Sequence, residues 1–267
     1  MSSALVALCP GPTVPFACSA EPMPDFPRSL CLTSLTWVEV SAHLAHDQRL
    51  IVPIGTCDQH GPHLPIGTST LIANALCSEL SRDFGVLHAP ALEYGVNLPT
   101  ERLYAGAATL REKTLHRMLN DLLASWEDHG FEEFILITAY NYDPHVEALA
   151  TVIGTQARVR VIEALGIDLS AFCDGPDGAG HGGEIETALM LHLYPERVRM
   201  GAAEDFQPKG DEGVTSHTGS ITRIPANSPG TVGTPTLATA EKGRLIYEYI
   251  VQKIRAKVFL AAEPRDD

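Results

Sequence analysis

The strongest constraint on this chain is a segment in which an apolar run leads directly into a polar turn. Residues 50–54 are apolar, and Asp58, His60 and His63 follow shortly after them. In α/β enzymes, buried strands release polar side chains at their carboxyl ends, where the chemistry of such folds is concentrated. The spacing therefore predicts a strand that delivers one carboxylate and two imidazoles into a candidate site.

Helical and extended patterns alternate along the rest of the chain. The patterns predict strands over residues 50–54, 86–89, 134–138 and 159–163. They predict helices over residues 36–47, 71–84, 110–126, 144–156, 183–194 and 236–258. Thr36 and Glu39 have the spacing of a capping box at the start of the first helix. This alternation predicts an α/β fold with a mostly parallel central sheet and helices on both faces.

The length of 267 residues suits one large domain, which we expect over residues 31–260. We expect residues 1–30 to form a flexible N-terminal arm and residues 261–267 a frayed tail. The arm is apolar, but it has no basic segment and prolines interrupt it, which disfavours a signal peptide. Residues 205–235 are rich in Gly, Ser, Thr and Pro, and we expect a long loop or short hairpin near the site there.

Charge and cysteine content narrow the possible partners and the location. The net charge is −14, from 33 acidic and 19 basic side chains, and no Lys/Arg cluster offsets it. This balance argues against nucleic acid and anionic membranes as partners, and no apolar run is long enough to span a membrane. The six cysteines are scattered without a C-x-x-C pair, which favours reduced thiols and a cytoplasmic location. We expect the partner to be a small-molecule substrate.

Three groups of residues could carry chemistry. Asp58 and His60 offer a carboxylate and an imidazole, which suit zinc or manganese, although an Asp that caps the turn would need no metal. Asn141 and Asp143 follow the expected strand over residues 134–138. His145 could add a ligand there, or could face solvent on the first turn of the next helix.

The third group is His181, Glu184 and Glu186, among glycines that allow the backbone to approach a ligand closely. The two glutamates begin a helix, where their negative charges could simply stabilise the positive end of the helix dipole. Because they are two residues apart on that helix, they cannot face the same way. We expect Glu184, three residues after His181, to be the one that faces the site.

These groups resemble the motifs of the creatininase (creatinine amidohydrolase) family. Residues 52–70 are similar to the family signature P-[IV]-G-S-x-E-Q-H-G-P-H-L-P-L-x-T-D. Residues 139–145 resemble N-G-H-Y-E-N, residues 181–188 resemble H-A-G-E-x-E-T-S, and residues 230–243 resemble G-V-x-G-D-P-x-x-A-T-A-E-K-G. A further block survives only in outline over residues 100–110, without its His and its Pro. The resemblance spans roughly residues 35–255 and implies a compact α/β sandwich that assembles as a hexamer.

The family resemblance also implies a chemistry and a set of ligands. Creatininase-like enzymes use two metal ions to activate water that opens an amide or lactam, and relatives include formamide deformylases and peptide-trimming enzymes. By position, Asp58, Ser69 and Asn141 would hold one ion, and His60, Ser69 and Asp143 the other. The position of His181 implies a catalytic histidine. We also expect Tyr104, Tyr140, Tyr142 and His63 to contact the substrate.

Four of these positions depart from the family pattern. Asp58 and Asp143 stand where the family has Glu, Asn141 where it has His, and Ser69 where it has the bridging Asp. A neutral hydroxyl cannot hold two cations about 3.5 Å apart, which is the spacing that two-metal catalysis requires. The glycines and prolines of the signature are intact, so the changes indicate altered chemistry rather than decay.

Three hypotheses remain open from the sequence. The first is an amidohydrolase with at most one metal ion, held by His60 and Asp143, in which His181 and Glu184 handle protons. The second is a metal-independent enzyme that uses Asp58, His60, His181 and Glu184 for acid–base work such as cyclisation, dehydration or isomerisation. The third is a catalytically silent protein that binds a ligand or stabilises a partner complex.

Overall fold

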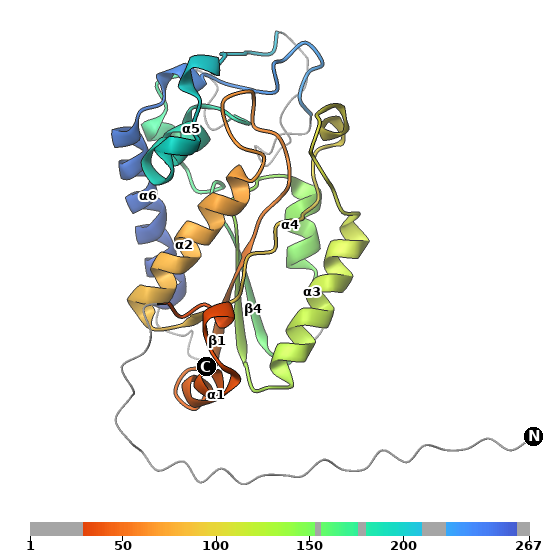
Figure 1. Cartoon of the computed structure of the whole chain (residues 1–267), viewed down its shortest axis with the longest axis vertical. Helices are drawn as coiled ribbons and strands as arrows, with labels where there is room; N and C mark the ends of the chain where they lie inside the picture. The colour runs from red at the N-terminus through yellow and green to blue at the C-terminus, as the bar shows by residue number, and fades with distance from the viewer. Residues whose placement is uncertain (1–28, 153–155, 176–179, 210–222, 261–267) are drawn as a thin grey trace, which may run out of the picture.

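A parallel sheet forms the centre of the computed structural model, which describes residues 29–152, 156–175, 180–209 and 223–260. Within these ranges the sheet has four strands in the order β2-β1-β3-β4. Their bounds are β1 (Arg49–Ile54), β2 (Leu87–His88), β3 (Glu133–Thr138) and β4 (Arg158–Glu163). All three pairings are parallel, and helices cover both faces, so the predicted fold class is confirmed (Figure 1).

The helices divide into two layers around this sheet (Figure 1). One layer contains α2 (Thr68–Phe84), α5 (Glu184–Leu193) and α6 (Ala240–Ile254). The other layer contains α3 (Glu112–Glu127) and α4 (Asp143–Ala150), with α1 (Trp37–Leu44) near the start of β1. The remaining short elements are the 3₁₀ turns η1 (Leu32–Ser34), η2 (Pro99–Leu103), η3 (Ser170–Phe172), η4 (Pro195–Arg197), η5 (Met200–Ala202) and η6 (Pro235–Leu237), and the π-helical turn η7 (Arg255–Phe259).

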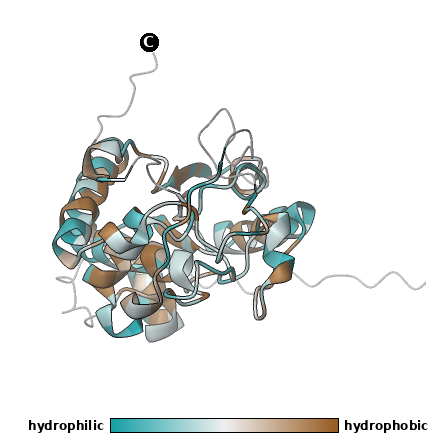
Figure 2. Ribbon diagram, turned by 90° about the horizontal axis from the view of Figure 1, so that it is seen from above, coloured by the Kyte–Doolittle hydropathy of each residue, from teal (hydrophilic) through white to brown (hydrophobic). Residues whose placement is uncertain are grey.

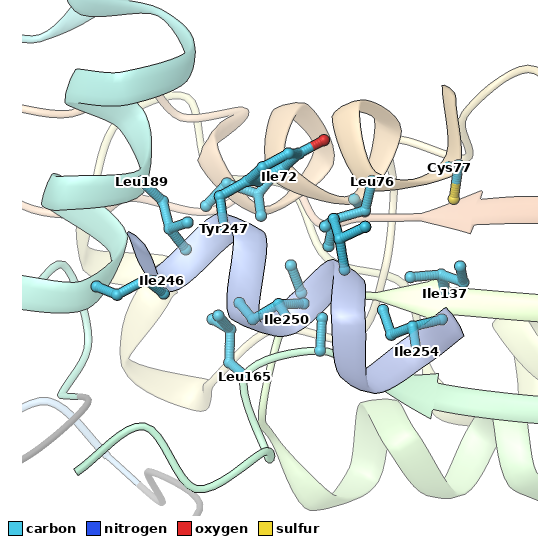
Figure 3. Close-up of a cluster of buried hydrophobic side chains, with 14 of the residues drawn as sticks. Ile72, Leu76, Cys77, Ile137, Leu165, Leu189, Ile246, Tyr247, Ile250 and Ile254 are labelled. Atoms are coloured by element: carbon cyan, nitrogen blue, oxygen red, sulfur yellow. The ribbon is translucent and has the colours of Figure 1, made fainter. Parts of the chain in front are cut away.

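Alternation along β1 assigns its side chains to two separate cores. Ile51 packs in the core under α2, α5 and α6, whereas Leu50 and Val52 pack in the core under α3 and α4. Figure 3 shows the first core, in which Ile246, Tyr247, Ile250 and Ile254 of α6 meet Ile72 and Leu76 of α2 and Ile137 of β3. Because both faces of the sheet centre are buried, β1 and β3 read as nearly continuous apolar runs, whereas the edge strand β4 alternates Arg and Val over residues 158–161.

The second core explains the amphipathic pattern of α3. Leu115, Leu119 and Leu123 lie one helical turn apart and are fully buried against Phe134 and Leu136 of β3. The hydropathy colouring in Figure 2 shows helices with both brown and teal residues, as expected for elements that bury one face and expose the other. None of the helices in the described ranges combines the length and apolar character that a membrane span requires.

Several element bounds differ from the sequence prediction. The helix expected over residues 144–156 ends at Ala150. The helix expected over residues 236–258 is divided, because the Thr239 hydroxyl accepts a hydrogen bond from the Lys242 amide and caps a new start after η6. The Thr36–Glu39 capping box is present as expected. Residues 1–28 and 261–267, which include most of the expected arm and the tail, lie outside the described residues.

The strand register determines where polar residues can gather. Ile54 of β1 pairs with Thr138 of β3, which pairs in turn with Glu163 of β4, so these strands end at the same edge of the sheet. The loops that follow the strands lie at the upper end of the molecule in Figure 1. Residues after β1 and after β3 are therefore brought to a common region, as the carboxyl edge of a parallel sheet requires.

Candidate active site

Segments that are distant in sequence supply the polar side chains of this region. Asp58, Gln59 and His60 follow β1, and Ser69 lies in the first turn of α2. His181 precedes α5, and Glu186 lies in the first turn of that helix. All of these side chains are buried, and Asp58, His60 and Ser69 are completely inaccessible to solvent.

Two glycines allow His181 to reach His60. Gly180 and Gly182 have φ of +29° and +58°, and a Cβ on Gly182 would lie only 2.7 Å from the carbonyl oxygen of His60. Val232 donates its backbone N–H to the carbonyl of His181 over 2.7 Å and so fixes the histidine from the other side. The imidazole rings of His181 and His60 consequently lie with their centroids 4.5 Å apart.

Asp58 has one oxygen that is satisfied and one that is not. Oδ1 accepts a 2.6 Å hydrogen bond from the Thr56 hydroxyl, whereas Oδ2 is buried and has no hydrogen-bond partner among the described residues. Burial raises the pKa of this carboxyl, and the nearby imidazoles of His60 and His181 oppose that rise. An unpartnered carboxylate oxygen in a closed site is a place where a cation or a ligand donor would bind favourably.

The imidazole of His60 lies between two acidic side chains. Its Nε2 is 3.3 Å from Oε1 of Glu186 and 3.2 Å from the Ser69 hydroxyl oxygen. Its Nδ1 is 3.3 Å from the backbone oxygen of Asp58 and 3.9 Å from Oδ1 of the same residue. Burial alone would lower the pKa of His60, but the charges of Asp58 and Glu186 outweigh it and raise the pKa to about 10.

The tautomer of His181 follows from the group that faces it. Its Nε2 lies 2.6 Å from the backbone oxygen of Gln59, which can only accept, so Nε2 carries the hydrogen and Nδ1 of the neutral ring keeps a lone pair. Burial and the adjacent charge of His60 lower the pKa of His181. In the absence of a cation, the site thus pairs a charged imidazole with a neutral one.

Glu101, in η2, is a buried carboxyl that was not among the site residues predicted from the sequence. Its Oε2 accepts a 2.8 Å hydrogen bond from the Gln59 amide, and its Oε1 lies 3.7 Å from Nε2 of His181. Burial raises the pKa of Glu101, and the hydrogen bonds from Gln59 oppose the rise. The signal that could have found it is the family block over residues 100–110, in which this glutamate survives while its neighbours have changed.

The two glutamates at the start of α5 point in different directions, as their spacing requires. Glu184 accepts hydrogen bonds from the backbone amides of Asp174 and Gly175 and forms an ion pair with Lys242. Glu186, by contrast, faces His60 and accepts a 2.6 Å hydrogen bond from the Gly182 amide. The structure therefore brings Glu186 to the cluster and directs Glu184 toward α6, the reverse of the orientation expected from the sequence.

Residues after β3 contribute less to this cluster than the motifs suggested. Among the described residues, the His, Cys, Asp and Glu ligand atoms that lie within 4.8 Å of one another belong to Asp58, His60 and His181. Asp143 is not part of that group and begins α4 as a half-buried residue, beside the half-buried Asn141. The expected metal role of Asp143 thus gains no support from a shared set of donors.

His145 is a structural residue rather than a solvent-facing one. It is fully buried, its Nδ1 accepts a 3.2 Å hydrogen bond from the Val96 amide, and its Nε2 lies 3.1 Å from the Thr138 hydroxyl oxygen. Burial lowers the pKa of His145 to about 3, so the ring is neutral. The sequence pattern left open whether His145 faces solvent or the site, and in the structure the ring packs inward.

The candidate substrate contacts surround the cluster at different depths. Tyr140 is buried, accepts a 3.2 Å hydrogen bond from the Leu98 amide, and packs edge-on to His181 at 6.3 Å between centroids. His63 is buried against the Thr187 hydroxyl at 2.8 Å, and burial lowers the pKa of His63 to about 4. Tyr104 and Tyr142 are half-buried, which leaves part of each ring available to a ligand.

The donor set fits one divalent cation. A carboxylate with two imidazoles is a common ligand set for zinc, iron and manganese, and it leaves positions free for substrate or water. The unpartnered Oδ2 of Asp58 is the observation that supports such a fit, because a buried carboxylate oxygen without a donor is costly unless a positive group neutralises it. The neighbouring carboxyls of Glu101 and Glu186 add negative potential at the same place.

Comparison with known proteins identifies the family. The family model described as creatininase, creatinine amidohydrolase, matches residues 33–258. The chain belongs to the creatininase family. Creatinine amidohydrolase of Pseudomonas putida is 28% identical over 253 residues, which cover 85% of this chain and 95% of that protein. The mycofactocin precursor peptide peptidase of Mycobacterium tuberculosis is 29% identical over 218 residues, which cover 76% of this chain and 81% of the peptidase.

Solved creatininase structures have the same fold. A zinc–zinc form of a creatininase mutant aligns with a TM-score of 0.72 at 28% identity, over 86% of this chain and 98% of that one. A manganese form of creatininase aligns equally well, with a TM-score of 0.72 and the same coverage. The family assignment made from the motifs is thus confirmed, and the creatininase relatives are hydrolases.

Proposed function

We propose that this creatininase-family protein is a hydrolase that cleaves a C–N bond of a small amide, lactam or formamide with the help of a single divalent cation. The observation that carries the proposal is the convergence of Asp58, His60 and His181, whose ligand atoms lie within 4.8 Å of one another, in a buried site where Oδ2 of Asp58 has no hydrogen-bond partner among the described residues. The zinc and manganese forms of related creatininases support these two metals as the candidates. The serine at position 69 supports one ion rather than two.

The residues of the cluster divide into ligands and a proton carrier. Asp58, His60 and His181 would hold the cation, which supplies polarisation of a carbonyl group and acidification of water. Glu101 is our candidate to hand a proton to the departing nitrogen, because its pKa is raised and it lies beside His181. Glu184, expected from the sequence to handle protons, is less suited because it is engaged with Lys242.

Metal analysis of untagged protein, from cells supplied with zinc, manganese and iron, tests this proposal. We expect about one ion per chain. Removal of the ion with a chelator should abolish turnover of a panel of lactams, formamides and small amides, and zinc or manganese should restore it. Asp58→Asn should lower both metal content and turnover. Two ions per chain, or turnover that survives complete metal removal, would contradict the single-cation proposal.

A metal-independent acid–base enzyme is the second candidate. The observation that favours it is the charge balance around His60, where Asp58 and Glu186 stabilise an imidazolium without any metal. Such a site could protonate and deprotonate a substrate directly. Chelator-insensitive turnover that is lost in His60→Ala would support this candidate against the first.

We also propose that the protein assembles into a homo-oligomer, a hexamer by analogy with the family. Trp37 and Val38, neighbours on α1, support the proposal, because they are 73% and 55% exposed and adjacent exposed apolar side chains favour association. Light scattering should give a mass about six times that of the chain. A monomer would contradict the proposal and leave the hydrolase assignment unaffected.

A further inference from the structure

The side-chain amide of Gln59 is buried and has a partner for each of its polar atoms. Its Oε1 accepts a 2.7 Å hydrogen bond from the Gly61 amide. Its Nε2 lies 3.1 Å from Oε1 of Glu101 and 2.9 Å from the backbone oxygen of Gly230. A backbone N–H can only donate, and a carbonyl or ionised carboxylate oxygen can only accept, so these partners fix the orientation of the amide. Both Nε2 hydrogens are therefore committed, one to each oxygen.

The backbone of Gln59 contacts two residues of the site. Its N–H donates to Oε2 of Glu101 over 2.8 Å, and its carbonyl accepts the Nε2 hydrogen of His181 over 2.6 Å. Gln59 thus holds Glu101 through both carboxylate oxygens and holds His181 through the ring. As a result, Oε1 of Glu101 lies 3.7 Å from Nε2 of His181. One residue therefore sets how the carboxyl of Glu101 lies relative to the His181 ring.

A glycine allows the segment that fixes His181 to close over the Gln59 amide. Gly230 has φ of +107°, and a Cβ at this position would collide with Oε1 of Gln59. The carbonyl of Gly230 accepts from Gln59, and two residues later the N–H of Val232 holds the backbone oxygen of His181. The amide therefore joins three parts of the site, which are the turn after β1, η2 and the segment that fixes His181.

The two hydrogen bonds from Gln59 favour the ionised form of Glu101. As a carboxylate, Glu101 can take a proton from the attacking water and pass it to the nitrogen as the C–N bond breaks, so that it ends the reaction as it began. Both transfers require the carboxyl to stay within hydrogen-bonding reach of the reacting atoms. Without Nε2 of Gln59, Oε1 of Glu101 would lose the hydrogen bond that fixes it.

We propose that the side-chain amide of Gln59 is a positioning group for proton transfer, which holds Oε1 of Glu101 beside the His181 ring. This role rests on the function proposed above and on the part assigned there to Glu101. The backbone N–H and carbonyl of residue 59 remain in any variant, so substitutions at this position test the amide alone.

The turnover of Gln59 variants with and without Glu101 tests this role. Gln59→Met keeps the length of the side chain and removes its donors, and it should lower kcat by about 10- to 100-fold. We expect KM and metal content to change little. In the Glu101→Gln background the same substitution should lower kcat by at most about 2-fold, because no carboxyl remains to be positioned. Equal factors in the two backgrounds would show a general structural effect and would overturn the inference.

The matched control is Asn97→Leu. Asn97 is also a buried amide, but its Nδ2 donates to the backbone oxygens of Cys57 and Ala108. This variant should unfold at a lower urea concentration than the wild type, and any change in its kcat should be the same in the two backgrounds. A loss that depends on Glu101 as strongly as that of Gln59→Met would overturn the inference, because any buried amide near the site would then act alike.

A second variant and metal analysis separate this role from other causes. Gln59→Asn is used if Gln59→Met does not fold, because an amide one methylene shorter cannot reach both Glu101 and Gly230, and it should show the same dependence on Glu101. Loss of metal from either variant would overturn the inference. Failure of the proposed function would look different, since Glu101→Gln would then keep the kcat of the wild type, or turnover would survive chelation.

Discussion

His60 and His145 are both completely buried, yet their environments drive them to opposite charge states. His60 follows β1 and lies beside Asp58 and Glu186, and its pKa is raised to about 10. His145 lies in the first turn of α4 after β3, contacts a backbone amide and the hydroxyl of Thr138, and its pKa is lowered to about 3. Burial is common to both, so the neighbouring groups decide the charge. The residues after β1 therefore form the candidate reactive cluster. The residues after β3 contribute a neutral, buried histidine with a structural role.

Removing each imidazole in turn gives the strongest test of this difference between His60 and His145. His60→Ala should abolish metal binding and turnover and should destabilise the fold by about 3–5 kcal/mol, because it leaves Asp58 and Glu186 as unpaired buried charges. His145→Ala should leave metal content intact and lower stability through a cavity and the unsatisfied Val96 amide. Metal analysis and urea unfolding of both variants provide the measurements. Retained turnover in His60→Ala would remove that residue from the site.

The pH dependence of stability should differ in sign between the two histidines. In chelated protein, the raised pKa of His60 means that its contribution is fully present below the unfolded value of 6.5 and is lost as the pH rises toward 10. The lowered pKa of His145 means that its contribution is present above pH 6.5 and is lost as the pH falls toward 3. Each effect should be on the order of several kcal/mol.

Urea unfolding at pH 4, 6, 8 and 10, compared between wild type and each alanine variant, isolates these contributions. The difference between wild type and His60→Ala should shrink toward alkaline pH, and the difference between wild type and His145→Ala should shrink toward acid pH. Parallel curves for either variant would show that the histidine does not titrate as its neighbours imply.

A matched pair of threonine substitutions should give the smallest effect. The Thr56 hydroxyl donates to the Asp58 carboxylate, whereas the Thr138 hydroxyl contacts the neutral ring of His145. Thr56→Val should cost about 1.5–3 kcal/mol as the partner of a charged group, and Thr138→Val about 0.5–1.5 kcal/mol. Thermal and urea unfolding of both variants check the order. A larger loss in Thr138→Val would contradict the assigned charges.

Much of the architecture was predictable because it depends on local periodicity. The apolar runs of β1 and β3 and the leucine face of α3 reflect burial that repeats along each element, and a sequence shows such repeats directly. The end of α4 at Ala150 and the division of the last helix at Thr239 depend on single capping contacts, which are weaker signals.

The site was predictable in its residues and less so in its geometry. Asp58, His60 and His181 were identified by motif, and the structure brings them together. Sequence spacing showed that Glu184 and Glu186 diverge, but the choice between them depended on Lys242, a residue of another helix. Glu101 entered the site through a contact with Gln59 across 42 positions of sequence, which no local pattern encodes.

The bridge between His181 and Val232 bears on how far relatives of this chain can diverge. Its hydrogen bond joins main-chain atoms, so the side chain at position 232 can be exchanged without releasing the histidine. His181 can keep its position while the surrounding loops acquire new side chains. The backbone that holds the site and the substrates that the loops select can therefore evolve separately. A family whose members include a creatinine amidohydrolase and a precursor-peptide peptidase is what such a division of labour would produce.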